Sequence, residues 1–219
     1  MEIGRIFDLS VPLKPGMPTW ADSQEVKIEY VGSVARDGAT SERLSMASHS
    51  GTHVDAPAHF VQDGTTVDQV PLSKLVGFGY CIRPEFKGTE IHRPDFEKVW
   101  SKEYDGNIIL VNTGWDRKRD FSDEFQKQFP ALSEDSIDFF REHRVKTIGI
   151  DALGIEPYSH TDFKVHQALL GAGIPFIEDM AGLHELEEGK KYLIAALPLK
   201  IHNGSGGMAR AIAMEITGE

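Results

Sequence analysis

The sequence predicts a mixed α/β protein that folds as one domain over residues 1–219. Short strand-like patterns occur near both ends of the chain, and the second half alternates apolar runs with a capped helical segment. Such alternation favours strands joined by helices within one sheet. Glycine and proline are dispersed, and no repeat or low-complexity tract marks a boundary. A chain of this length can bury a sizeable core as one domain.

The N-terminal region is expected to contain two short strands, at residues 3–11 and 26–32. Between them, residues 12–20 contain three prolines, which exclude regular structure and predict a loop. Met17 and Trp20 lie in this loop, where they could form a pocket wall or an interface. The alternative, a loop that packs its own apolar residues, is equally open.

The second half contains the clearest pattern. An apolar strand at 108–112 is followed by a helix from the N-cap Ser133 to about His143, and then by a buried strand at 147–151. This order predicts a right-handed parallel crossover. The remaining elements expected here are a helix near 163–171 and strands at 174–178, 192–200 and 208–216.

Composition restricts the class of partner. The net charge is −11, with 40% hydrophobic and 26% charged residues, and no basic cluster is present that would bind nucleic acid. The single cysteine, Cys81, lies in an apolar run and is expected to be a buried, inert thiol. The first residues lack the apolar region of a signal peptide, and no apolar run could span a bilayer, so we expect a cytoplasmic protein.

The segment from His49 to His59 concentrates groups that can bind metal or move protons. Gly51 and Pro57 disfavour a helix, so an extended or turning conformation is expected. Side chains alternate along a strand, so His53 and Asp55 would point to the same side. Gly51 would let the chain bend so that His49 converges on them, and Pro57 would direct His59 towards the same cavity.

This residue set is typical of a metal-dependent hydrolase. Imidazole nitrogen and carboxylate oxygen suit zinc, manganese or cobalt, and water bound to zinc loses a proton near neutral pH. His59 would then move protons rather than bind the metal, and the Ser50 and Thr52 hydroxyls would support the ligands. The alternative is a chance cluster of histidines, because nine are spread over the chain.

Other ligands could come from the far half of the chain. His166 is expected on a helix, and Glu178 at the end of the following strand, where a sheet commonly places a site. Residue type and position alone still favour structural roles for both, and His160 is a further candidate. The histidines without such neighbours, expected at the surface, are His92, His143, His184 and His202.

At these residues the sequence resembles the metal-dependent cyclase family, which includes bacterial kynurenine formamidases and isatin hydrolases. The family signature His-x-Gly-Thr-His-x-Asp-x-Pro-x-His is complete from His49 to His59. The similarity extends along most of the chain, through Asp8-Leu-Ser10, Asn112-Thr-Gly-Trp115, Ile150-Asp151, His166-Gln-Ala-Leu-Leu170, Ile177-Glu178, Leu197-Pro-Leu-Lys200 and the closing segment from Gly204.

The resemblance implies a ligand set. It assigns His49, His53 and Asp55 to a first metal. In the formamidase type it assigns Asp55, His166 and Glu178 to a second metal, with His59 as proton donor and acceptor. It also implies a layered β/β/α, swivelling-domain-like fold and dimers or larger oligomers. His160 has no counterpart in the pattern, so its part in the site stays open.

Two positions depart from the family pattern. Asp179 and Met180 follow Glu178 where the formamidases commonly have Asn or Gly and then Leu. Gly206 replaces the proline of the family's Gly-Ser-Pro ending. Both departures concern the substrate rather than the metal ligands.

Together these features predict an arylformamidase that acts on N-formylkynurenine or a similar aryl formamide through metal-bound hydroxide. The metal is expected to be Zn²⁺, one or two per subunit, with Mn²⁺ as an alternative. Trp20, Phe60 and Trp115 are candidates to stack on the substrate ring, and a homodimer or homotetramer is expected. Open alternatives are an isatin hydrolase or other hydrolase that opens a cyclic amide or lactone, and a non-catalytic protein that binds a metal or small acid.

Overall fold

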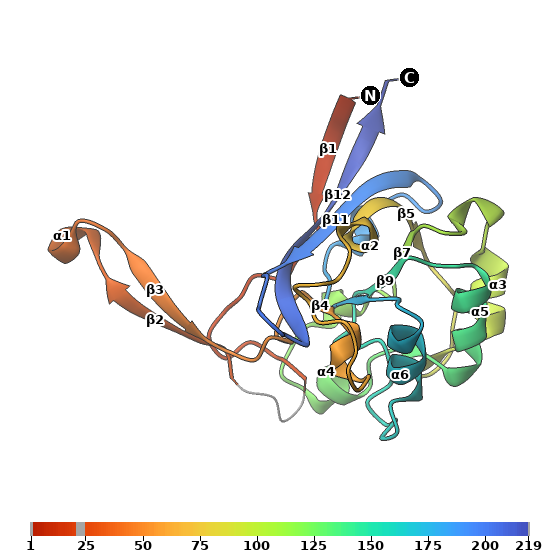
Figure 1. Ribbon diagram of the computed structural model, residues 1–219, viewed down its shortest axis with the longest axis horizontal. Coiled ribbons are helices and arrows are strands. Elements are labelled where there is room, and N and C mark those ends of the chain that lie inside the picture. Colours follow the sequence, from red (N-terminus) through yellow and green to blue (C-terminus); the bar gives the residue numbers. More distant parts are fainter. Residues whose placement is uncertain (1, 21–24, 219) are drawn as a thin grey trace.

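The computed structural model describes residues 2–20 and 25–218, and its main feature is a sheet of eight strands (Figure 1). In spatial order the strands are β1 (Glu2–Asp8), β12 (Gly206–Thr217), β11 (Lys191–Pro198), β5 (Val76–Ile82), β7 (Ile108–Val111), β9 (Thr147–Ile150), β10 (Phe176–Glu178) and β4 (His53–Asp55).

The sheet closes into a barrel-like arrangement because β4 pairs with both β10 and β12. The long strand β12 makes this closure possible. Its first residues, 206–208, pair with β4, and its later part pairs with β1. Strands β1 and β12 together form a two-stranded ribbon that runs towards the N and C labels in Figure 1. The prediction of a mixed α/β single domain is confirmed, whereas the closure of the sheet was not predicted.

The central strands β5, β7, β9 and β10 run parallel and are covered on both faces. Ile109 and Val111 of β7 face an outer core, packed against helices, and Ile108 and Leu110 face the inner core of the barrel. Burial on both faces explains why β7 reads as a continuous apolar run. The predicted parallel pairing of residues 108–112 with 147–151 is confirmed.

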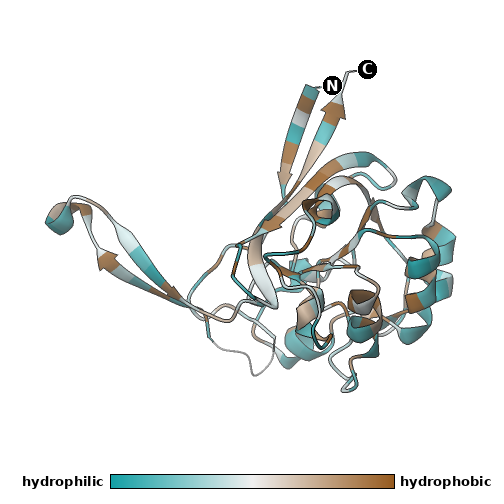
Figure 2. Cartoon of the chain, in the orientation of Figure 1, coloured by the Kyte–Doolittle hydropathy of each residue, from teal (hydrophilic) through white to brown (hydrophobic). Residues whose placement is uncertain are grey.

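The helices of the outer core lie on one side of the sheet, and their ribbons carry both hydrophilic and hydrophobic residues (Figure 2). The buried hydrophobic residues pack in the outer core. These helices are α3 (Arg93–Val99), α5 (Ile137–Glu142) and α6 (Lys164–Gly171). The shorter elements are α1 (Val34–Asp37), α2 (Leu72–Leu75), α4 (Asp123–Lys127), the strands β2 (Lys27–Gly32), β3 (Ser41–Ser45), β6 (Glu90–Ile91) and β8 (Ala131–Leu132), and the 3-10 turns η1 (Pro57–His59), η2 (Lys102–Tyr104), η3 (Trp115–Lys118), η4 (Glu134–Ser136) and η5 (Leu183–Glu185).

Two local predictions need correction. The helix expected from Ser133 begins as the 3-10 turn η4 and becomes α-helical only at Ile137. Ser133 makes no side-chain cap to the backbone, and its hydroxyl donates to the Asp135 carboxylate. The first strand ends at Asp8, and beyond it Ser10 makes only an isolated bridge with Met180. Residues 12–20 form the predicted loop, and Cys81 is buried in the inner core as expected.

Strands β2 and β3 form an arm that projects from the body of the molecule (Figure 1). All five residues of β3 are exposed, and so are the large apolar side chains of Tyr30, Val31 and Val34. An isolated two-stranded hairpin is only marginally stable in water. No helix within the described residues is long and apolar enough to cross a membrane.

Candidate metal centre and active site

The closure of the sheet brings the predicted ligands together. In the register of β4 with β10, His53 lies opposite Glu178, and the signature segment therefore meets the far half of the chain. His166 reaches the same place from α6, which precedes β10. His53 Nε2 lies 3.5 Å from Glu178 Oε2, and His166 Nε2 lies 3.4 Å from Glu178 Oε1.

Gly51 makes the bend that was predicted for the signature segment. Its φ of 66° lies in the left-handed region, which glycine adopts without the steric cost of a Cβ. A Cβ at this position would also lie 2.8 Å from Leu13 Cδ2, closer than real Cβ contacts. The bend directs His49 back towards β4, where its Nδ1 is 2.6 Å from Asp55 Oδ1.

Asp55 lies at the centre of the cluster, with its side chain only 1% exposed. Its Oδ1 faces His49 and lies 3.2 Å from His53 Nε2. Its Oδ2 is buried and has no hydrogen-bond partner among the described residues. Buried polar atoms are normally satisfied, so this free oxygen is a position where a cation fits.

Within the described chain, two groups of side chains have ligand atoms close enough to share an ion: His49 with Asp55 and His59, and His53 with Asp55 and Glu178. Asp55 belongs to both groups, as a bridging carboxylate would. The grouping differs in part from the predicted sets. It places His59 beside the first set, and it joins His53 rather than His166 to Glu178.

Two of the imidazoles, those of His53 and His166, have one nitrogen held by a partner outside the cluster. His53 Nδ1 lies 2.7 Å from the Gly51 carbonyl, and His166 Nδ1 lies 2.8 Å from Glu156 Oε2. These acceptors require a proton on Nδ1, so Nε2 is the nitrogen of each ring that faces the cluster. Such outer partners fix the tautomer and orientation of metal-binding histidines, so the residues present fit a divalent metal.

The charges of the cluster are strongly coupled. Burial alone would raise the pKa of Asp55, but the hydrogen bonds from His49 and His53 outweigh it and hold that pKa well below its usual range. Burial opposes protonation of His53, yet Asp55 and Glu178 raise its pKa well above normal. Both pKa shifts have the same cause: a positive charge is favoured between the two buried carboxylates of Asp55 and Glu178.

His59 differs from the other histidines. Its ring stacks on that of His49, with centroids 3.8 Å apart, and its Nε2 lies 3.9 Å from Asp55 Oδ2. Burial is the main cause that lowers the pKa of His59 to about 4, and His49 adds to it while Asp55 opposes it. The ring is therefore neutral at pH 7 and able to accept a proton.

A cavity of about 270 Å³ opens onto the cluster. It is lined by Trp20, Ala47, His49, His53, His59, Phe60, Leu153, Phe163, His166 and Glu178. Two of the predicted stacking residues, Trp20 and Phe60, thus lie at the cavity. A larger cavity elsewhere contains none of these residues, so the smaller one is the candidate active site.

Trp115 was predicted to stack on the substrate ring, but it does not line this cavity. It is 9% exposed, its ring stacks on Phe125 and its Nε1 donates to the Phe125 carbonyl at 3.1 Å. The turn before it explains the position. Asp151 accepts hydrogen bonds from the backbone N–H groups of Thr113 and Gly114, so the chain after β7 is held against the outer core.

A sequence profile of the family described as "Putative cyclase" matches residues 7–157. The chain belongs to this cyclase family. A kynurenine formamidase of Erythrobacter litoralis is 30% identical over 219 residues, which cover 97% of this chain and 94% of that protein. A kynurenine formamidase of Bacillus cereus is 27% identical and covers 99% of this chain and 100% of its own length.

Solved structures agree in fold. A potential metal-dependent hydrolase with cyclase activity superposes with a TM-score of 0.83 at 27% identity, over 98% of this chain and 99% of that one. Isatin hydrolase A from Labrenzia aggregata, bound to benzyl benzoate, gives 0.84 at 25% identity, over 96% and 93%. His166 and Glu178 lie beyond the part matched by the family profile, but these relatives extend over almost the whole chain.

The remaining predicted residues occupy supporting positions. Thr52 Oγ1 accepts from the Val11 backbone N–H at 2.9 Å and donates to the Asp179 carbonyl at 2.6 Å, which ties the signature segment to the residue after Glu178. Ser50 is fully buried. His160 Nδ1 lies 3.3 Å from Glu156 Oε1, so it contacts a residue that holds His166 rather than the cluster itself.

Several supporting residues were missed in the sequence. Glu156 also accepts from the backbone N–H groups of Val165 and His166, so one carboxylate fixes both the start of α6 and the His166 ring. Ser205 Oγ lies 2.9 Å from His49 Nε2. A buried glutamate in a loop and a serine in a glycine-rich turn carry no local signal, and only the closure of the sheet brings Ser205 to His49.

Proposed function

We propose that this member of the cyclase family is a metal-dependent hydrolase of a non-peptide carbon–nitrogen bond, with arylformamidase activity as its main reaction. The observation that carries the proposal is the carboxylate of Asp55, which belongs to both groups of metal-capable side chains and whose Oδ2 has no hydrogen-bond partner among the described residues. The names of the relatives support a formamidase, with N-formylkynurenine or a similar aryl formamide as the expected substrate.

The ligands proposed for a first divalent metal are His49, His53 and Asp55, and those for a second are Asp55, His166 and Glu178. Imidazole and carboxylate ligands suit Zn²⁺, with Mn²⁺ as the alternative. A divalent ion bound here would supply a Lewis acid for the amide carbonyl and lower the pKa of a water. The swivelling-domain-like layering and a cytoplasmic location belong to the same proposal.

His59 is the proposed proton carrier. Its neutral ring borders the cavity, and 30% of its side chain remains exposed, so it can meet both water and substrate. It would accept the proton of the attacking water and pass it to the leaving nitrogen, while Trp20 and Phe60 hold the aryl ring. Metal ligation by His59 is the competing role, because its Nε2 lies close to Asp55.

The substitution His59→Ala separates these roles. If His59 carries protons, metal content should stay at the wild-type level while kcat falls by roughly two to four orders of magnitude. If His59 is a ligand, the variant should lose metal, as measured by elemental analysis after dialysis. His202→Ala is a matched control, since His202 is 86% exposed on its side chain and lies outside the cavity. Normal turnover by His59→Ala would refute the assignment.

Opening of a lactam such as isatin is the second candidate, favoured by the structural similarity to isatin hydrolase A. The same residues would serve it, so an assay of formamide and isatin side by side is needed to distinguish the two. A non-catalytic protein that binds a metal or small acid is the third candidate. Tight metal binding without turnover of any amide or lactam would favour that reading over both enzymes.

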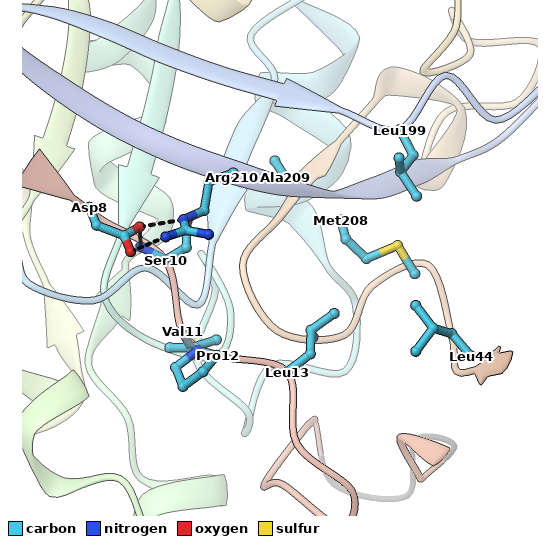
Figure 3. Close-up of a pocket in the computed structure, with 10 residues that line it drawn as sticks. All are labelled: Asp8, Ser10, Val11, Pro12, Leu13, Leu44, Leu199, Met208, Ala209 and Arg210. Carbon is cyan, nitrogen blue, oxygen red and sulfur yellow. Dashed lines mark hydrogen bonds and ion pairs between the residues drawn. The ribbon is translucent and has the colours of Figure 1, made fainter. Parts of the chain in front are cut away.

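We also propose a homodimer, with a homotetramer as the alternative. The arm exposes Tyr30, Val31 and Val34, and a cavity of about 610 Å³ lies where the arm joins the body. Figure 3 shows this cavity between apolar side chains and the ion pair of Asp8 with Arg210. Apolar surface of this kind supports association with a second copy. Light scattering of the purified chain would test it, and a monomeric mass at micromolar concentration would overturn it.

A further inference from the structure

Trp20 supplies one wall of the candidate active-site cavity and is the last residue of the loop at 12–20. Its indole packs on Phe129 and Tyr158, with ring centroids 5.5 and 5.4 Å away. The Gln126 side-chain amide donates to the carbonyl of the residue before Trp20 at 3.1 Å. These contacts hold the ring against the outer core, so its position at the cavity depends on how closely the outer core lets it approach.

Gly154 lies against this indole and allows its close approach. A Cβ at Gly154 would lie 2.7 Å from Trp20 Cζ3, which is 0.7 Å less than the 3.4 Å of ordinary van der Waals contact. The φ of Gly154 lies outside the left-handed region, so a side chain here would meet no backbone strain of that kind. What the glycine provides at this position is therefore space for the indole.

The backbone on both sides of Gly154 is fixed by hydrogen bonds to the end of β10. The Ala152 carbonyl accepts from the N–H of the residue after Glu178 at 2.8 Å. The Ile155 N–H donates to Glu178 Oε1 at 2.6 Å. The segment 152–155 therefore contacts two parts of the site: Ile155 holds a predicted metal ligand, and the residue before it supports the aromatic wall.

We propose that Gly154 is a positioning residue of the active site, which places the Trp20 indole against the segment 152–155 and so sets the position of the aromatic wall of the cavity. The catalytic consequence rests on the proposed function, in which Trp20 holds the aryl ring of the substrate. A side chain at position 154 would displace the indole rather than its other neighbours. The backbone is held by hydrogen bonds and Phe129 is fully buried, whereas Trp20 is only partly buried.

The substitution Gly154→Ala tests this role. The displaced indole should be more accessible to acrylamide, so quenching of Trp20 fluorescence should rise. Because the chain has three tryptophans, the signal of Trp20 is taken as the difference from the same protein with Trp20→Phe. With zinc-loaded protein and N-formylkynurenine, KM should rise by about 2–10-fold, as for the loss of one aromatic contact, while kcat stays near the wild-type value. Zinc affinity should not change, because Ile155 keeps its bond to Glu178.

A double-mutant cycle distinguishes this role from a general packing effect. The shorter phenylalanine ring lacks the part of the indole that carries Cζ3, so Gly154→Ala should have little further effect on KM in a Trp20→Phe background. An equal effect in both backgrounds would overturn the inference. Loss of zinc with unchanged Trp20 quenching would also overturn it, because the backbone beside Glu178 would then have moved instead of the indole. If Gly154→Ala alone did not fold, folding of the double variant would support the inference, and its failure to fold would contradict it.

The quenching measurement separates this inference from the proposed function, because it needs no substrate. If zinc-loaded protein hydrolyses neither formamide nor isatin, the proposed function fails. Higher quenching of Trp20 in Gly154→Ala then still supports the positioning role, and unchanged quenching contradicts it. Gly77→Ala is the matched control, since its Cβ would make only ordinary contacts of 3.6 Å or more. It should leave Trp20 quenching, zinc affinity and KM at their wild-type values.

Discussion

Gly206 is the residue whose substitution should disturb the metal centre most selectively. A Cβ at this position would lie 2.4 Å from His49 Cε1 and 2.6 Å from the Val54 carbonyl oxygen. The first distance is about 1 Å short of ordinary van der Waals contact at 3.4 Å. The Val54 backbone is fixed by pairing of β4 on both sides, so in Gly206→Ala the His49 ring has to move.

The expected effect follows from that displacement. A misplacement of about 1 Å in a site can cost roughly 100-fold in rate, and added volume in a packed region costs about 1–3 kcal/mol of unfolding free energy. We therefore expect Gly206→Ala to bind the first metal about 10–100-fold more weakly in a chelator competition assay. Its kcat/KM, measured at saturating metal, should fall by a similar factor.

Gly77→Ala is the matched control, because its Cβ would meet Lys146 Nζ at an ordinary 3.6 Å. It should bind metal like the wild type. If Gly206→Ala also bound metal and turned over substrate like the wild type, the packing of His49 against β12 would not matter for the site. The departure from the family's proline would then have no consequence at this residue.

Three further outcomes are expected. Glu156→Gln should weaken the second metal by about 10–100-fold in calorimetry while the first stays bound, because His166 is the one predicted ligand that Glu156 contacts. Equal loss of both metals would contradict this. Trp115→Ala should lower unfolding free energy by about 3–5 kcal/mol in urea titration, whereas Trp20→Ala should mainly raise KM; the reverse pattern would place Trp115 at the substrate. Burial raises the pKa of Asp151 from 3.8 to about 6, so the contribution of Asp151 to stability is present below pH 4 and is lost as pH rises through 6. The difference in unfolding free energy between the wild type and Asp151→Asn should therefore change by about 3 kcal/mol between pH 4 and pH 6. A difference that does not change with pH would refute this prediction.

The strands and the bend that were predicted from the sequence depend on residues that are close together in the chain. Residues 108–112 and 147–151 were expected as strands and agree with β7 and β9 to within a residue, because strands buried on both faces leave an unbroken apolar run. The bend at Gly51 and the extended conformation of His53 to Asp55 follow from a glycine and β-branched neighbours. Each of these features depends on neighbours in the chain.

The features that were missed depend on long-range pairing. Ser205 supports His49 across 156 positions of sequence, and no pattern within either segment indicates the other. Trp115 follows a strand at the edge where site residues gather, yet the packing of Phe125 from α4 draws it into the core. The arm likewise has a strand pattern at residues 26–32 that says nothing of where the hairpin points.

Closure of the barrel and the candidate metal centre depend on the same strand. Strand β4 has three residues, pairs with β10 on one side and β12 on the other, and carries two of the predicted ligands. Asp55 and Glu178 lie on adjacent strands and repel one another until positive charge separates them. A bound divalent ion should therefore hold the barrel closed as well as complete the site.

Hydrogen exchange can distinguish this coupling from a general gain in stability. A ligand present at 100 times its dissociation constant stabilises the folded state by about 2.7 kcal/mol, so metal should raise the melting temperature. If the ion holds the closure, chelation should speed exchange of amides at 53–55 and 206–208 far more than at 108–111 in the central strand β7. An equal change in exchange rate over all three segments would mean that the barrel closes without the metal. The site would then form between strands that are already paired.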